Sequence, residues 1–203
     1  NPRLYFTAAD LPDLRGRAHL AGSTPDADSR GFLIDRWAKI LGDANSWFTA
    51  TPPTENTRAI ACKALSFVWQ LSRNAAYRDR AVALMQDAFT VIDSDDNVVS
   101  HQLTNYAAAY DWLAGDLSGA ERTLLRARLK RGADAAHGYL LTGARSHNHR
   151  SKSGAALVSW ALAVGPYMEE VQTFFDDAID EGLRRVWRYM FTADGVYRDG
   201  AGY

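Results

Sequence analysis

Residues 55–73, ENTRAIACKALSFVWQLSR, decide the fold class, because apolar side chains occur on nearly every side of the helix that they would form. The apolar positions include Ile60, Leu65, Val68 and Trp69. A helix that is apolar all round is usually buried all round. Two prolines at 52 and 53 cannot continue a helix, so they mark a break before it. The segment therefore predicts a buried helix in an all-α core.

Helical patterns continue on both sides of this segment, and strand patterns are scarce. More buried helices alternate with more amphipathic ones, and short connections require neighbouring helices to run antiparallel. We therefore expect an all-α fold of antiparallel helical hairpins in an inner and an outer layer, as in solenoids and helical toroids. Residues 1–203 are expected to form a single domain. The expected helices cover 7–21, 30–41, 55–73, 75–92, 100–114, 118–141, 154–164 and 168–191.

Composition narrows the class of protein. The 203 residues are 47% hydrophobic, which argues against disorder, and the net charge of −1 does not point to a nucleic-acid partner. A neutral protein can still bind an acidic substrate through a few local arginines. The single cysteine, Cys62, excludes an internal disulfide. No apolar stretch approaches the roughly 20 residues that a membrane helix needs, so we expect no membrane association.

The chain begins with Asn1-Pro2 rather than Met, which indicates that a preceding segment was removed. If that segment is a signal peptide, the protein is secreted or periplasmic. At the other end, residues 197–203 contain two glycines and stop on Tyr203 within a polar segment, so we expect the natural protein to continue. The sequence gives no expectation for the oligomeric state.

Two polar clusters carry the candidate chemistry, one at residues 146–153 and one at residues 194–203. If the intervening helices form one antiparallel hairpin, Asn148, His149 and Tyr203 meet around one cleft. An amide can hydrogen-bond a carboxylate or an oxyanion, and an imidazole can exchange a proton near neutral pH. A phenol becomes a base only when positive charge lowers its pKa, and Arg150 and Arg198 supply such charge. Together these groups suit the abstraction of a proton next to a carboxylate.

Each of these residues also has an ordinary structural interpretation. An Asn-His pair beside a helix is commonly a capping residue next to an exposed imidazole. The pair His147 and His149 suggests a metal site, but no second pair with zinc spacing accompanies it, so we expect neither a metal nor a cofactor. Residues 93–96 lack the spacing of a calcium loop and are interpreted as a solvated turn. Gln102 and Asn105, near His101, either line the cleft or sit at the start of a helix.

The motifs taken together resemble those of the heparinase II/III-like and alginate lyases. The opening residues 1–7, NPRLYFT, are similar to the start of the mature enzymes. The run from Asn148-His149-Arg150 to Leu157 resembles their Asn-His motif at the head of an inner helix. Residues 194–203, DGVYRDGAGY, resemble their Asp-Gly loop ending in Tyr, with Asp199 in place of Glu. The resemblance spans nearly the whole chain, with the motifs in the family's order.

The resemblance implies an incomplete (α/α) toroid followed by a β-sandwich domain, and β-elimination at a 4-linked uronic acid. Asn148 would neutralise the C5 carboxylate, Tyr203 would protonate the departing 4-oxygen, and His149 would be a base or would lower the pKa of the tyrosine. Another histidine would come from the region after Tyr203. The partner would be an acidic polysaccharide of the alginate or glycosaminoglycan type. The further residues expected to bind substrate are Arg150, Arg198, His147, Gln102 and Asn105.

Two other functions share these residues. A uronate C5-epimerase abstracts the same proton but returns one instead of expelling the 4-oxygen. A non-catalytic carbohydrate-binding helical module would bind without forming product. A glycoside hydrolase needs two facing carboxylates, and the two polar clusters contain no such pair. The leading prediction is a polysaccharide lyase.

Overall fold

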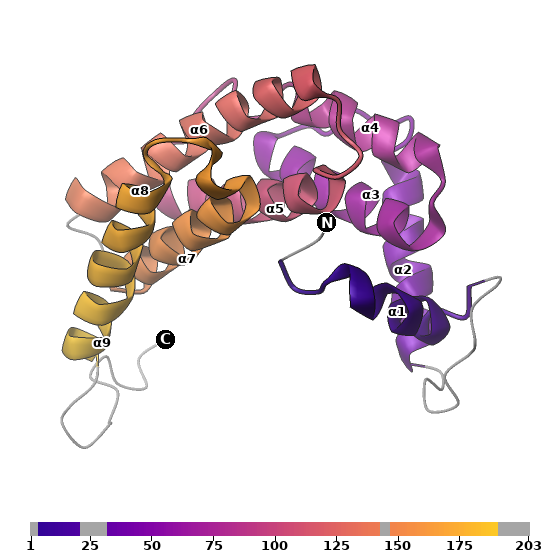
Figure 1. The fold of residues 1–203 in the computed structure, drawn as a ribbon, viewed down its shortest axis with the longest axis horizontal. Helices are drawn as coiled ribbons and strands as arrows, with labels where there is room; N and C mark the ends of the chain where they lie inside the picture. Colours follow the sequence, from indigo (N-terminus) through magenta and orange to yellow (C-terminus); the bar gives the residue numbers. More distant parts are fainter. Residues whose placement is uncertain (1–3, 21–31, 143–146, 191–203) are drawn as a thin grey trace.

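The fold was analysed in a computed structural model that describes residues 4–20, 32–142 and 147–190. The described chain is all-helical, as the sequence predicts, and no strand occurs within these ranges (Figure 1). The elements are η1 (Ala8–Asp10), α1 (Leu11–Arg17), α2 (Phe32–Ser46), α3 (Glu55–Ser72), α4 (Ala75–Met85), α5 (Asp96–Leu113), α6 (Gly119–Thr142), α7 (His147–Val164), η2 (Gly165–Tyr167), α8 (Val171–Asp177), the π-helical η3 (Ala178–Arg184) and α9 (Arg185–Met190).

Side-chain caps fix where several helices begin. The Thr54 hydroxyl accepts from the backbone N–H of Thr57 at the start of α3, and the Asp95 carboxylate caps α5. Before α6, the predicted capping box is present. The Ser118 hydroxyl accepts from the Glu121 N–H at 3.2 Å, and the Glu121 carboxylate accepts from the Ser118 N–H at 2.7 Å. Such contacts satisfy backbone donors that have no partner within the helix.

Helices α3, α5 and α7 lie side by side and run parallel to one another, forming the inner layer (Figure 1). Gln70, near the end of α3, donates to the carbonyl of Trp112 near the end of α5. Ser100 and Ser153, each in the early part of its helix, share a hydrogen bond of 3.0 Å between α5 and α7. The three N-terminal ends therefore lie along one edge of the layer.

Helices α4, α6 and α8 form the outer layer and run opposite to the inner helices. Arg78 of α4 pairs with Glu121 of α6 at 3.0 Å, and His137 of α6 meets Asp177 of α8 at 2.7 Å. The core between the layers is fully buried, with large side chains such as Leu103, Leu129 and Trp160. Figure 1 shows that the stacked hairpins curve into an open arc. The closed toroid and a following β-sandwich domain stay predictions.

Several predicted helix boundaries are wrong. Helix α7 begins at His147 rather than at residue 154, so most of the first polar cluster is helical. Helix α5 begins at Asp96 rather than at residue 100, and α4 ends at Met85 rather than at residue 92. The first turns of α5 and α7 are rich in polar side chains, so they lack the apolar periodicity that predicts a helix. Several of these side chains form hydrogen bonds between the two helices, which a local sequence pattern does not show.

The predicted helix 168–191 is continuously helical from Val171 to Met190, but its middle part is π-helical, so that it comprises α8, η3 and α9. Its π-helical part meets α7 at Gly182 and Gly154, where a Cβ atom added to Gly154 would lie 2.9 Å from the Gly182 Cα. Trp160 contacts Phe174 near one end of this hairpin, and Gly154 contacts Gly182 further along, so the two arms are antiparallel. The end of α9 is therefore directed toward the edge at which α7 begins.

Candidate functional site

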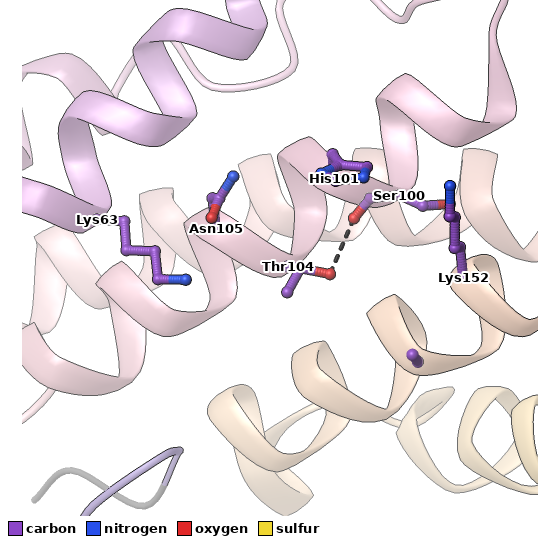
Figure 2. A pocket seen from close by; sticks show the side chains of 7 residues that line it. Lys63, Ser100, His101, Thr104, Asn105 and Lys152 are labelled. Carbon is purple, nitrogen blue, oxygen red and sulfur yellow. Dashed lines mark hydrogen bonds between the residues drawn. The ribbon is translucent and has the colours of Figure 1, made fainter.

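A groove of about 330 Å³ lies on one surface of the inner layer. Each of the three parallel helices contributes one face to it, so positions three or four apart along α5 recur in its lining. Figure 2 shows the polar side chains arranged along this groove. The lining residues are Lys63 of α3, Ser100, His101, Thr104 and Asn105 of α5, and Lys152 and Ala155 of α7.

The groove presents hydrogen-bond donors and positive charge. Among the described residues, Lys63, His101 and Asn105 have no side-chain hydrogen bond or ion pair. Lys152 donates to the side-chain oxygen of Asn97 at 2.8 Å, a neutral partner that leaves its charge uncompensated. No aspartate or glutamate occurs among the described residues of the lining. A groove with two ammonium groups and no carboxylate favours an anionic ligand.

Asn148 and His149 lie in the first turn of α7, at the same end as Lys152. Asn148 precedes Lys152 by four residues and therefore shares its face of the helix. His149 has 26% of its side chain exposed, and its Nδ1 lies 2.8 Å from Oδ1 of Asp96 in the first turn of α5. The predicted Asn-His pair thus lies one helical turn before Lys152 and is not among the residues that line the groove; the imidazole is held from the neighbouring inner helix.

Asp96 fixes the proton arrangement of His149. Its side chain is 5% exposed, and Oδ1 also accepts from the backbone N–H of Asn97 at 2.9 Å. The first turn of a helix favours a negative charge. Because an ionised carboxylate only accepts, Nδ1 of a neutral His149 is the donor, and the lone pair lies on Nε2. This arrangement leaves Nε2 as the ring nitrogen able to take a proton.

Asp96 is not among the site residues predicted from the sequence. The interpretation of residues 93–96 as a solvated turn is wrong for Asp96, which is buried. Two aspartates directly before a polar helical start are a capping signal, which would have placed Asp95 and Asp96 at the head of α5. The contact with His149 spans 53 positions in the sequence, so no local pattern reports it.

Asp96 and His149, together with Asp95, also form a cluster of side chains that could bind a metal ion. One ligand atom each from Asp95, Asp96 and His149 lies within 4.8 Å of the others. However, Oδ1 of Asp95 accepts from the N–H groups of Asn97 and Val98, and Oδ1 of Asp96 accepts from Asn97 and His149. A cation would compete with these hydrogen bonds, and capping accounts for the cluster. We therefore assign no metal to it.

The other predicted site residues have different positions. Asn105 lines the groove. Gln102 is buried between α5 and its neighbours, with 1% exposed, and is not among the lining residues; its side-chain oxygen has no partner within the described chain. Arg150 is 16% exposed and pairs with Glu181 of η3 at 3.3 Å, so it supports the packing of α7 rather than the groove. His147 is the first residue of α7.

Tyr203 and Arg198 lie outside the described residues, and their approach to Asn148 and His149 stays a prediction. That prediction requires an antiparallel hairpin between the two polar clusters, and the hairpin of α7 with α8, η3 and α9 is antiparallel.

No known protein-family model matches the sequence, and no curated protein shows a significant match to it.

Proposed function

We propose that this chain is the helical part of a polysaccharide lyase that cleaves 4-linked uronic-acid polymers by β-elimination. The observation that supports this most directly is the His149–Asp96 pair, 2.8 Å apart, which lies one helical turn before Lys152 of a groove whose described lining contains two lysines and no carboxylate. Such a groove suits a polyanionic sugar chain, and the imidazole supplies a base at the position where the chain would react.

The reaction follows from the roles of these residues. The amide of Asn148 hydrogen-bonds the C5 carboxylate and withdraws charge from it, which makes the C5 proton more acidic. Nε2 of His149 removes that proton as the C5–H bond breaks and a C4–C5 double bond forms. The C4–O4 bond breaks at the same time, and Tyr203 gives a proton to the departing oxygen. Asp96 stabilises the imidazolium that results, as a buried acceptor at Nδ1.

Two features favour elimination over hydrolysis or simple binding. Hydrolysis needs two carboxyl groups facing the scissile bond, and the described lining of the groove has none. The Asp96 contact at Nδ1 leaves Nε2 of His149 free to act as a base, a group that binding alone does not use. A C5-epimerase would use the same base, so the product distinguishes the two enzymes.

The proposed substrate class is alginate or a glycosaminoglycan, and the proposed location is outside the cytoplasm, in the periplasm or the medium. Among the described helices, none combines the length and the apolar character needed to cross a membrane.

The test is a panel of uronic-acid polysaccharides incubated with the full natural chain and followed by ultraviolet absorbance of the unsaturated product. We expect His149→Ala to lower turnover by about 10²–10⁴-fold, the usual contribution of a general base. The matched control is His137→Ala, which removes an imidazole paired with Asp177 at 2.7 Å in the outer layer.

We expect the His137→Ala protein to retain turnover. If no polymer gives an unsaturated product, or if His149→Ala and His137→Ala behave alike, the lyase proposal is wrong. Exchange of the C5 proton with solvent, without chain cleavage, would identify the epimerase instead.

A further inference from the structure

The segment before η1 is bound to the inner layer through both backbone groups of Leu4. The N–H of Leu4 donates to Oδ2 of Asp111 at 2.8 Å, and Nε1 of Trp112 donates to the Leu4 carbonyl at 3.1 Å; both contacts are buried. Phe6 stacks on Trp112 with ring centroids 5.3 Å apart. These contacts on either side of Tyr5 hold residues 4–6 against α5.

Tyr5 itself is held in an unusual conformation with its ring in solvent. Its φ is 68°, in the left-handed region that a bulky residue rarely adopts. The residue is nonetheless 68% exposed, and its ring makes an edge contact with Trp112 at 6.2 Å. Backbone strain of this kind persists only where the surroundings impose it, and it is concentrated at functional sites. Burial of the Tyr5 ring does not explain it.

Lys63 connects this exposed ring to the groove. Its Nζ lies 5.0 Å from the centroid of the Tyr5 ring, a cation–π distance. Lys63 lines the groove described above and also an adjoining, mostly apolar hollow of about 310 Å³. The remaining residues of that hollow are Ile40, Asp43, Ile60, Ala64, Phe67 and Trp112.

The ammonium group of Lys63 is incompletely compensated. Partial burial lowers the pKa of Lys63, and within the described chain no carboxylate pairs with it. Asp43 lines the same hollow but binds Lys39 at 3.4 Å. A cation that has lost part of its water without gaining a counter-charge is stabilised by an incoming anion.

We propose that Tyr5 and Lys63 form a sugar subsite at the α3 side of the groove, where the ring stacks on a pyranose face and the ammonium pairs with a uronate carboxylate. The inference rests on the proposed substrate class. An aromatic ring next to a charged group suits such a ligand, since one face of a sugar is apolar and a uronate adds an anion.

The position of this subsite predicts a dependence on chain length. Helices α3 and α7 flank α5, and neighbouring helix axes are about 8–10 Å apart, so the axes of α3 and α7 are some 16–20 Å apart. A sugar bound at Asn148 and His149 does not reach that far. The subsite therefore contributes to binding only when the oligosaccharide extends from α7 across α5 to α3.

The experiment measures dissociation constants for uronate oligosaccharides of increasing length, using the full chain with His149→Ala to prevent turnover. We expect Tyr5→Asn and Lys63→Gln to weaken binding of the longer oligosaccharides by about tenfold or more, and to leave the shortest unaffected. Asn tolerates the left-handed conformation, so Tyr5→Asn removes the ring without adding strain. The control is Tyr5→Phe, which keeps the ring and should bind normally.

Carboxyl-reduced oligosaccharides provide a second readout, because they lack the carboxylate that Lys63 is proposed to bind. With these ligands Lys63→Gln should no longer weaken binding, whereas Tyr5→Asn should still weaken it. Equal weakening at all lengths, accompanied by a lower melting temperature, would show a purely structural role and overturn the subsite. Unchanged binding in both variants would also overturn the subsite.

If the subsite variants behave as expected but the wild-type chain forms no unsaturated product, the lyase proposal fails and the subsite stands. If the wild-type chain binds no uronate oligosaccharide, both are overturned.

Discussion

Substituting Asp96 by Asn tests whether the inner-layer carboxylate is part of the catalytic machinery. The substitution keeps the size of the side chain and an oxygen that can accept from Nδ1 of His149, but removes the negative charge. In the native chain the two atoms are 2.8 Å apart, and the carboxylate is 5% exposed. The change therefore removes the charge that faces both the imidazole and the Asn97 N–H.

The expected loss follows from the strength of this contact. A hydrogen bond to a charged group contributes about 1.5–3 kcal/mol, against about 0.5–1.5 kcal/mol for a neutral one. The Asn side chain retains a neutral hydrogen bond, so the loss is the difference, about 1–1.5 kcal/mol, and it falls mainly on the transition state, in which His149 carries the abstracted proton. At about 1.36 kcal/mol for each factor of ten, turnover should fall roughly tenfold. Because Asp95 still caps α5, stability should change by no more than about 1 kcal/mol.

The assay is the initial rate of unsaturated-product formation at saturating polymer, together with urea denaturation of each variant. Asp95→Asn is the matched control, since it removes a neighbouring charge, retains a capping oxygen and leaves the Asp96–His149 contact in place. An Asp96→Asn protein that is folded and turns over like the Asp95→Asn protein would refute the reasoning. Nitrogen chemical shifts of the His149 ring give a readout that does not depend on activity, because removal of the charge should weaken the hydrogen bond at Nδ1 and move its resonance.

Three further predictions concern the fold. Gly154→Ala should lower the free energy of unfolding by about 1–3 kcal/mol in urea denaturation, since the added Cβ would lie 2.9 Å from the π-helical backbone at Gly182. The control Gly138→Ala, which has open space around it, should raise the free energy of unfolding by about 0.5–1 kcal/mol. Complete burial raises the pKa of Cys62, so a thiol reagent should label it only after unfolding; rapid labelling of native protein would contradict this. The backbone N–H of Ser118 donates to the Glu121 carboxylate and lowers the pKa of Glu121, so the contribution of that charge is present at neutral pH and is lost as the pH falls below the ordinary value of 4.5. The stability difference between wild type and Glu121→Gln should therefore shrink in acid, and a constant difference would contradict the assignment.

Much of the helical framework could be predicted from the sequence. The apolar segment that became α3 and the Ser118–Glu121 capping box before α6 both have local causes. Side-chain periodicity and capping act over a few residues, so they can be read directly. The start of α7 could not, because His149 in its first turn is held by Asp96, 53 positions away. The start of α5 has a local capping signal at Asp95 that the prediction overlooked.

The sequence by itself determined that the described chain is all-helical, that buried and amphipathic helices alternate along it, and that a polar cluster with Asn148 and His149 adjoins an inner helix. Only the tertiary structure decided which residues accompany them. The parallel register of α3, α5 and α7 brings Asp96 to His149 and places Lys63, His101, Asn105 and Lys152 along one groove. That register depends on packing between residues some 40–55 positions apart, as at Gln70–Trp112 and Ser100–Ser153, and no local periodicity encodes it.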